Sequence, residues 1–362
     1  MKAIPFLVLF LLTFGFPVVS QQYITFQNQA FEGRAHYGFM MPHRQRIGYL
    51  NQQNVSGMEL TWSYQVKGDK AWHRLFNYPQ KGISFYYFNL SSKKHFGYGL
   101  GILPHINFPI GEKRKFGVKV GYGLGYIQKP FDVKDNYKNL VIGTKINVLF
   151  NTGVNYRWNL SEKLLLKCGM NLTHFSNGAF KLPNLGINNL TADIGFSYSL
   201  NQDVILESPK EESSQRNWKH FVFSSFSVKE IELLSGKKYG ILNINSDALK
   251  KVTDKLVIGG GADFSYNSSL VHSLSGLDEN YEINNSDNIR MGVHGSFGLK
   301  IGRNYFLLQM GVYLRNKQDI LGPIYQRLVS RFAVTDNLFA TFTLKSHFAV
   351  ADYFEAGLGY RF

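Results

Sequence analysis

The sequence has little cysteine, little proline and few acidic residues. Cys168 is the single cysteine among 362 residues, so no disulfide can form within the chain and the fold must be held together in another way. Acidic residues number 25 against 40 lysines and arginines, which gives a net charge of +15. A strongly basic chain usually meets an anionic partner.

A long apolar run occurs only at the start of the chain. Lys2 precedes an apolar run over residues 6–19, and the small residue Ser20 follows it. This arrangement is typical of a secretory signal peptide, so we expect residues 1–20 to be removed. No cysteine directly follows the run, which argues against a lipoprotein anchor. Beyond it, no stretch reaches the apolar length of a membrane helix.

The rest of the composition predicts an all-β protein. Aromatic residues make up 15% of the chain and glycine contributes 35 residues, a combination of strand formers and glycine. Nucleic acid is a poor anionic partner for an exported, strand-rich chain without a recognisable nucleic-acid-binding motif. A membrane surface suits such a chain better.

Apolar residues alternate with small or polar ones through several stretches. In residues 96–108, 116–126 and 146–158 the even positions are mostly large and apolar, and the odd positions are mostly glycine, asparagine or a charged residue. A period of two places the two sets on opposite faces of a strand. A soluble sandwich would alternate in the same way, so alternation alone does not identify a membrane protein.

Three further features favour a membrane barrel. Aromatic residues gather at the ends of the apolar rows, as interfacial girdles do. The last stretch, 353–362, alternates and ends in Phe362, which resembles the signal read by the assembly machinery of bacterial outer-membrane barrels. Short turns such as 159–162 and 302–303 alternate with long loops. The long connections at 67–81 and 201–217 do not fit this pattern.

We therefore predict a transmembrane antiparallel β-barrel of about sixteen strands, integral to the bacterial outer membrane. The expected strands lie near 35–43, 57–66, 82–90, 96–108, 115–128, 145–158, 163–175, 189–200, 218–228, 237–245, 255–266, 289–301, 304–315, 326–334, 338–348 and 353–362. The alternative is two eight-stranded units from a duplication, because the stretch THFSNG before one strand resembles SHFAVA before the last. The halves would be 21–200 and 201–362.

His174 and Ser176 lie on the lipid-facing row of the strand at 163–177. That row continues Leu172, whereas Lys167 and Asn171 occupy the opposite, inward row, since a charged group facing lipid is costly. Residues two apart on a strand share a face, so the serine could act as a nucleophile with the histidine as its base. A His-x-Ser pair alone is more often structural. His347 falls on an inward row without such a serine, and we interpret it as a solvated lumen residue.

The residues around this pair resemble a known family. The run His174-Phe175-Ser176-Asn177-Gly178, then residues 183–188 and a final alternating strand, resemble the lipid A 3-O-deacylase family of outer-membrane barrels. Residues 71–74 and 78–82 are also similar to that family. The resemblance covers about residues 30–200 and implies an ester hydrolase that acts on the acyl chains of lipid A, the lipid anchor of lipopolysaccharide.

The resemblance also implies roles for individual residues. Ser176 would be the nucleophile and His174 the general base. The family has a glutamate at the position of Asn188 to orient the histidine, and this chain departs from it there. Asparagine can hold the histidine ring in the required tautomer, but it supplies no negative charge to stabilise the imidazolium. Candidates for the oxyanion hole are Asn177, Gly178 and Asn184, which ordinary turn formation would explain equally well. No cofactor and no metal are expected.

Two other functions stay open. A histidine and serine with asparagine as third member also resemble outer-membrane phospholipase A, a calcium-dependent, dimeric enzyme, although no acidic cluster near 174–192 suggests a calcium site. A non-enzymatic porin or transporter would use the wide lumen of a sixteen-stranded barrel. Basic residues after the first strand, namely His43, Arg44 and Arg46, could contact lipid A phosphates, although solvated loop residues are the commoner case.

Overall fold

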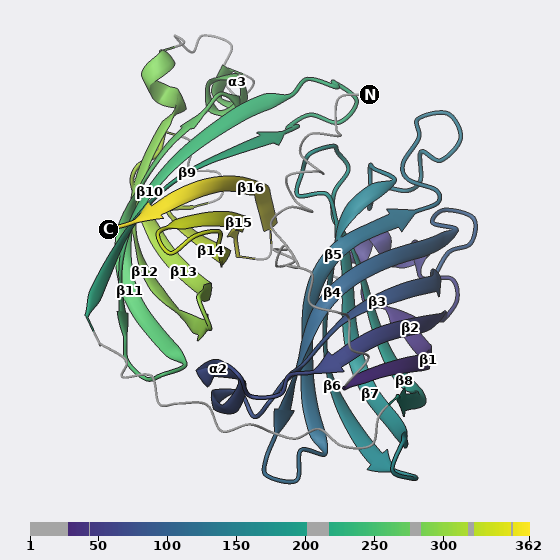
Figure 1. The fold of residues 1–362 in the computed structure, drawn as a ribbon. Coiled ribbons are helices and arrows are strands. Elements are labelled where there is room, and N and C mark those ends of the chain that lie inside the picture. Colours follow the sequence, from purple (N-terminus) through teal and green to yellow (C-terminus); the bar gives the residue numbers. More distant parts are fainter. Residues whose placement is uncertain (1–27, 43, 201–216, 276–283, 318–321, 349) are drawn as a thin grey trace. The chain divides into compact units, whose positions relative to one another are not determined.

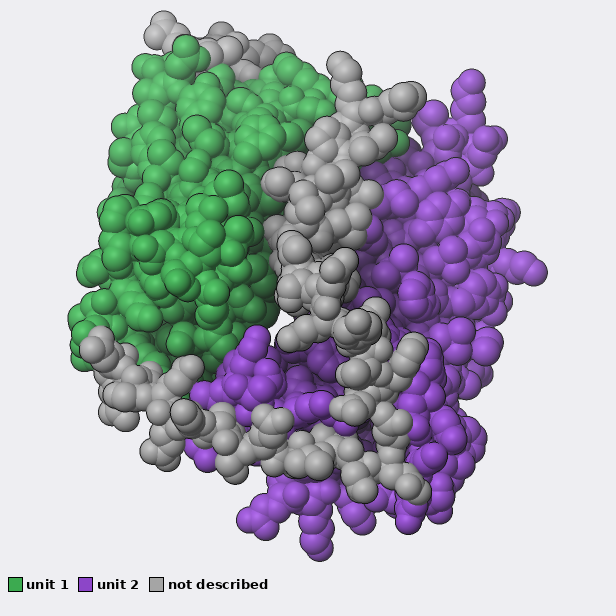
Figure 2. All heavy atoms as spheres, viewed as in Figure 1, with its two compact units in different colours: residues 1–22, 178–182, 213–362 green, residues 23–177, 183–212 purple. Residues whose placement is uncertain are grey.

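The computed structural model describes residues 28–42, 44–200, 217–275, 284–317, 322–348 and 350–362. The predicted signal peptide at 1–20, His43, the side chain of Arg46 and most of the connection at 201–217 lie outside these residues. The chain divides into two compact units, one around each barrel, which Figure 2 colours separately.

The first eight strands form a closed antiparallel barrel (Figure 1). Its strands are β1 (Gln29–Met40), β2 (Val55–Gln65), β3 (Gln80–Asn89), β4 (Tyr98–Ile110), β5 (Phe116–Ile127), β6 (Ile146–Asn159), β7 (Leu164–Ser176) and β8 (Ile187–Ser199). Each strand pairs with the next along the chain, and β1 pairs with β8 over residues 30–40 and 189–199, which closes the sheet. Because closure satisfies every edge, the sheet leaves no strand edge facing lipid.

The last eight strands close into a second barrel in the same way. Its strands are β9 (Trp218–Lys229), β10 (Tyr239–Lys251), β11 (Leu256–Asn267), β12 (Ile289–Ile301), β13 (Asn304–Arg315), β14 (Ile324–Ala333), β15 (Leu338–His347) and β16 (Val350–Arg361). The pairing of β16 with β9 completes it. The single sixteen-stranded barrel is therefore wrong, and the alternative of two eight-stranded barrels is confirmed.

The number of strands and most of their positions agree with the sequence prediction, but the first strand begins six residues earlier than predicted, at Gln29 instead of 35. Short helices lie in the connections: η1 (Gln45–Leu50), α2 (Ala71–Leu75), α3 (Ser269–Ser275) and η2 (Asn285–Asn288). Among the described residues, no helix is both long and apolar enough to cross a membrane.

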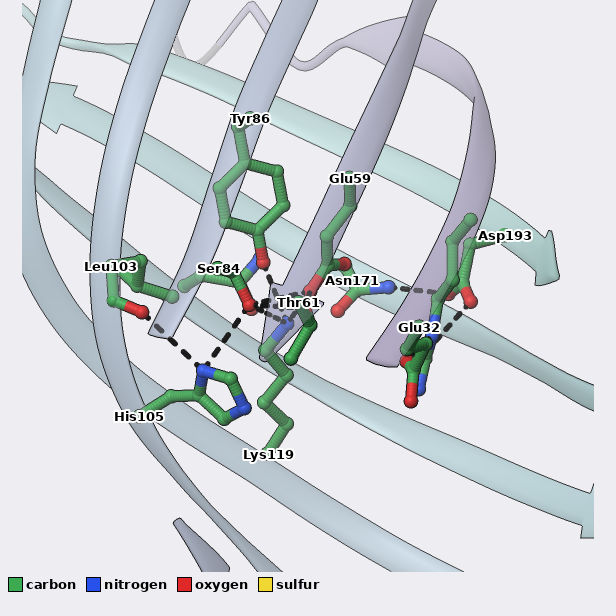
Figure 3. Close-up of polar contacts among 12 residues, drawn as sticks. Glu32, Glu59, Thr61, Ser84, Tyr86, Leu103, His105, Lys119, Asn171 and Asp193 are labelled. Atoms are coloured by element: carbon green, nitrogen blue, oxygen red, sulfur yellow. Dashed lines mark hydrogen bonds and ion pairs between the residues drawn. The ribbon is translucent and has the colours of Figure 1, made fainter. Parts of the chain in front are cut away.

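Charged side chains fill the interior of the first barrel (Figure 3). Glu59 is fully buried and accepts hydrogen bonds from Thr61 at 2.8 Å and Ser84 at 2.7 Å, and it pairs with Lys119 and with His36. A second group joins the buried side chains of Glu32, Arg34, Asp193, Lys167 and Asn171. Each buried charge therefore has an oppositely charged partner, as burial requires.

An apolar cluster packs across one end of the first barrel. It combines inward strand residues with residues of η1 and of the connections at 90–97 and 128–145. Its buried members are Met40, Ile47, Leu50, Val55, Tyr86, Phe88, Leu90, Phe96, Leu103, Ile127, Val141, Ile142, Leu149, Phe175 and Ile187. The cluster excludes water from this end of the barrel and holds the connections that surround the candidate site.

The interior of the second barrel is also packed with charged groups. His294 lies between two carboxylates, with Nε2 2.7 Å from Asp247 and Nδ1 3.0 Å from Asp263, and these pair in turn with Arg331 and Arg327. Because each barrel closes on eight strands with a filled interior, the wide shared lumen expected for a channel is wrong.

His347 also differs from the prediction. The side chain faces inward as expected, but it is buried, not solvated. Its Nε2 lies 3.0 Å from the hydroxyl of Tyr313, and its Nδ1 lies 3.8 Å from Asp352. The pattern of alternation gave its direction correctly, whereas its burial follows from the small radius of an eight-stranded barrel.

Candidate active site

Strand β7 places His174 and Ser176 on the outward row of the first barrel. Phe175, between them, points inward and is completely buried in the apolar cluster. Gly125 makes room for this ring, because a Cβ there would lie 2.5 Å from the Cδ1 atom of Phe175. Successive side chains of a strand point to opposite faces, so a buried Phe175 directs both neighbours outward. Met170, on the same row, is 54% exposed, as a lipid-facing residue would be.

The site lies at the end of the first barrel where the long connections meet. Strand β7 ends at Ser176, and the connection 177–186 leads to β8. The neighbouring connection 128–145 contacts it through an isolated bridge between Ile142 and Asn184. Two more hydrogen bonds run from the backbone N–H groups of Leu185 and Gly186 to the carbonyl of Val141. These contacts fix the segment that faces the serine.

Asn188 is the cross-strand partner of His174. The two residues lie directly opposite each other in the register of β7 and β8, and His174 Nδ1 is 2.5 Å from Asn188 Oδ1. With the amide oxygen as acceptor, the proton resides on Nδ1 and Nε2 carries the lone pair of a base. This pair brings together two of the three residues that the sequence predicts to be catalytic.

Gly186 defines the space available to the histidine ring. Its φ of +81° favours glycine, and a Cβ at this position would lie 2.5 Å from Cε1 of His174 and 3.3 Å from Nε2. A larger residue would therefore push the imidazole away from Asn188. Gly186 lies within residues 183–188, but the sequence pattern predicted no role for it.

Asn184 contacts Ser176 through both ends of its amide. Ser176 Oγ lies 3.2 Å from Asn184 Oδ1 and 3.1 Å from Asn184 Nδ2. The same Oδ1 accepts the backbone N–H of Asn177 at 2.9 Å. Ser176 itself is buried, and His174 is half-buried. The Asn184 amide is therefore in direct contact with the hydroxyl oxygen of Ser176.

Asn177 and Gly178 are placed differently. The side chain of Asn177 donates to Thr144 Oγ1 at 3.0 Å, so it ties the end of β7 to the connection before β6. Gly178 adopts a left-handed conformation, with φ of +60°, which turns the chain immediately after the site. Both positions are consistent with a turn as well as with a role in catalysis.

Thr144 and Asn147 support the site and were missed by the sequence analysis. Thr144 Oγ1 donates to Asn147 Oδ1 at 2.8 Å, and Asn147 Nδ2 donates to the carbonyl oxygen of Thr144 at 2.9 Å. Asn147 is almost fully buried. No motif or periodicity marks these residues, because the contact joins segments about thirty residues apart that only the fold brings together.

The acidic residue that follows His174 in the sequence points away from it. Asp193 is the first acidic residue after His174 in the sequence, and it faces inward, where it pairs with Arg34 at 2.8 Å. Among the described residues, no three histidine, cysteine or acidic side chains gather as metal ligands would. Arg44, suggested as a phosphate contact, is exposed in the connection after β1.

Comparison with protein families identifies both halves of the chain. Residues 56–197 match the family described as Lipid A 3-O-deacylase (PagL). Residues 217–362 match the family described as Acyloxyacyl hydrolase, C-terminal domain. No curated protein matches the sequence at a significant level.

Solved structures give only distant similarities. The outer membrane protein Omp33 of Acinetobacter baumannii is 9% identical, with 92% of this chain and 97% of that one covered, at a TM-score of 0.17. CdiB from the same organism is 7% identical over 92% of this chain and 60% of that chain, with a TM-score of 0.20. A bacterial polysaccharide outer membrane secretin is 8% identical over 93% and 99%, with a TM-score of 0.23. TM-scores this low support no conclusion about fold or function.

The outer faces of the barrels agree with the family matches. Large apolar residues on the outward rows of both barrels are exposed, among them Met58 and Ile194 in the first and Met310 and Leu328 in the second. An apolar outer face around a closed sheet is what a barrel in the outer membrane requires. Residues 56–197 therefore form a domain of the lipid A 3-O-deacylase family of ester hydrolases, and residues 217–362 form an acyloxyacyl hydrolase C-terminal domain.

Proposed function

We propose that this protein hydrolyses an ester-linked acyl chain of lipid A, with Ser176 as the nucleophile and His174 as the general base. The observation that carries the proposal is the position of His174 on the outward row, with Asn188 Oδ1 2.5 Å from its Nδ1. A substrate held in the membrane reaches this face by lateral diffusion. The ester at the 3-O position, for which the family is named, is the bond we expect to be cleaved.

The reaction uses the two nitrogens of the imidazole for different tasks. Asn188 accepts the Nδ1 proton, so Nε2 can take the proton of Ser176 Oγ while that oxygen attacks the ester carbonyl. The resulting tetrahedral intermediate collapses when His174 returns the proton to the sugar oxygen that leaves. A water molecule, deprotonated by the same nitrogen, then attacks the acyl-serine and releases the free fatty acid.

Asn184 is the donor that we propose for the oxyanion. Its Nδ2 lies 3.1 Å from Ser176 Oγ, and the carbonyl oxygen of a bound ester would come within reach of the same amide. The backbone N–H of Asn177 donates to Asn184 Oδ1 and so holds the amide in the orientation that leaves Nδ2 next to the serine hydroxyl. Donors already aligned before reaction are worth a few kcal/mol to such a transition state.

Asparagine in place of an acidic residue lowers the expected rate. Asn188 holds the ring in the tautomer that the reaction needs, as asparagine does in Cys-His-Asn sites. It adds no negative charge to stabilise the imidazolium that forms when Ser176 loses its proton. We therefore expect a functional but slower hydrolase than one with a carboxylate at this position.

Incubation of the purified protein with lipopolysaccharide tests the proposal. Mass spectrometry of the lipid and of the released fatty acids should show loss of one ester-linked chain. Ser176→Ala should abolish this release, and Ser56→Ala is the matched control, since Ser56 is the second residue of β2 at the same end of the same barrel. Equal release by the Ser176→Ala protein would show that this serine is not the nucleophile.

Asparagine as the third member also favours a second candidate, a phospholipase with the same nucleophile and base. Vesicles of phosphatidylethanolamine, assayed with calcium and with a chelator, distinguish the two. Calcium-dependent release of fatty acid from the vesicles, with lipopolysaccharide left intact, would select the phospholipase.

We also propose that the barrel assembly machinery recognises the last strand, β16, together with the exposed Phe362 that follows it.

A further inference from the structure

The end of the first barrel opposite the proposed active site carries a collar of two connected segments. We use this name for the connection 66–79, which contains α2, and the turn 111–115 between β4 and β5 (Figure 1). The two segments are joined by hydrogen bonds from Asn77 Nδ2 to the carbonyl of Gly111 at 2.9 Å and from an Arg114 amino group to the carbonyl of Tyr78 at 3.0 Å. The collar is therefore one surface made from distant parts of the sequence.

A hollow of about 420 Å³ opens beside this turn, lined by Ile110, Gly111, Glu112, Lys113, Lys115, Phe116 and Tyr156. One wall is apolar, because Ile110 and Phe116 are both exposed large side chains. The Phe116 ring packs edge-on against Tyr156 at 4.7 Å, and Tyr156 packs against Trp158 at 4.3 Å. Aromatic residues of this kind mark the depth of the membrane–water interface.

The other wall is basic. The collar contains six lysines and arginines against two acidic residues, and one of these, Asp69, lies 3.0 Å from His73. Within the described part of the chain, Lys113, Arg114 and Lys115 form no ion pair. Burial lowers the pKa of Arg114 from its ordinary value, and its Nε is buried without a hydrogen-bond partner among the described residues. The cations that line the hollow itself are Lys113 and Lys115.

A single class of ligand satisfies both walls. We propose that the collar binds the phosphate of a phospholipid, with Lys113 and Lys115 at the headgroup and an acyl chain along Ile110 and Phe116. A free phosphate would use the cations but leave the apolar wall uncovered, so a phospholipid fits better. We expect this phospholipid to lie in the periplasmic leaflet, because the proposed function, on which this placement rests, puts the other end of the barrel in the lipid A leaflet. The binding itself does not depend on esterase activity.

Native mass spectrometry of the full chain in detergent, titrated with phosphatidylglycerol, tests this site. All proteins carry Ser176→Ala, so that hydrolysis of the lipid cannot affect the result. The variant Lys113→Ala/Lys115→Ala should weaken lipid binding by roughly tenfold or more. Lys93→Ala/Lys94→Ala, which removes two exposed lysines at the opposite end, should change it less than about twofold.

Three results would overturn the proposal. Equal binding by the two double variants would show that these lysines are not the site. Diacylglycerol binding as tightly as phosphatidylglycerol would show that the phosphate is not recognised. Displacement of the lipid by millimolar inorganic phosphate would assign the cations to a free anion instead. As a control for folding, each variant should show the same change in electrophoretic mobility between heated and unheated samples on a denaturing gel as the parent protein.

Discussion

Replacing Asn188 by aspartate should make the enzyme faster. The two side chains have the same shape, so the contact of 2.5 Å with His174 Nδ1 is retained. The amide can present either its oxygen or its nitrogen to the ring, and only the oxygen holds the tautomer that leaves Nε2 free. A carboxylate presents an oxygen in both orientations and carries the charge that the imidazolium requires.

The expected gain follows from the difference between a neutral and a charged hydrogen bond. A neutral bond contributes about 1 kcal/mol and one to a charged group about 1.5–3 kcal/mol. The low end applies here, because His174 is half-buried and water screens part of the interaction. A difference of about 0.5 kcal/mol that appears only when the imidazolium forms raises kcat about twofold.

The assay is single-turnover release of fatty acid from lipopolysaccharide by the purified proteins. The rate of release by Asn188→Asp should exceed that of the natural protein. The rate of Asn188→Ala, which removes the hydrogen-bond acceptor of His174, should fall below it. If both variants match the natural protein while Ser176→Ala is inactive, Asn188 does not orient His174. A rate for Asn188→Asp below that of Asn188→Ala would refute the electrostatic argument as well.

Two further changes test how the fold supports the site. Gly186→Ala should lower kcat by about a hundredfold, because its Cβ would displace His174, whereas Gly236→Ala, also at positive φ but with open space around it, should leave activity unchanged in the same fatty-acid assay. Thr144→Val should lower kcat about fivefold with little change in KM, because it removes the bond from Asn177 Nδ2. Thr144→Ser should restore the rate, and a failure of this rescue would contradict the proposed role of the hydroxyl.

The strands could be predicted from the sequence because alternation is a local property. A run such as 146–158 shows which side chains share a face wherever the strand lies in the barrel. Closure is different, since it depends on whether β8 pairs with β1 or with β9, which are both amphipathic and of similar length. The size of the inward residues was the available signal. Large inward charged residues such as Arg34 and Glu59 can fill the interior of a narrow barrel. Their burial away from water is strongly destabilising only when they lack an oppositely charged partner.

The site was predictable to the extent that its members are close in sequence. His174, Ser176 and Asn188 lie on two consecutive strands, so strand geometry alone predicts that they share the outward face. Thr144 reaches the site from a connection whose path follows no periodicity. Asn184 falls within the quoted motif, but its contact with Ser176 depends on the bridge to Ile142. Contacts of this kind come from the packing of loops and have no local signature.

The filled interior supports the proposal that the active site of this lipid hydrolase lies on the outside of the barrel. Charged pairs around Glu59 and Asp193 occupy the middle of the first barrel, and the apolar cluster around Phe175 packs across the end nearest the site. A substrate cannot enter that interior without breaking buried ion pairs, which costs about 3–5 kcal/mol for each partner removed. The outer face presents no such barrier to a lipid. A hydrolase on an eight-stranded barrel of this composition must therefore meet its substrate from the membrane, at the strand ends where polar side chains such as His174 are tolerated.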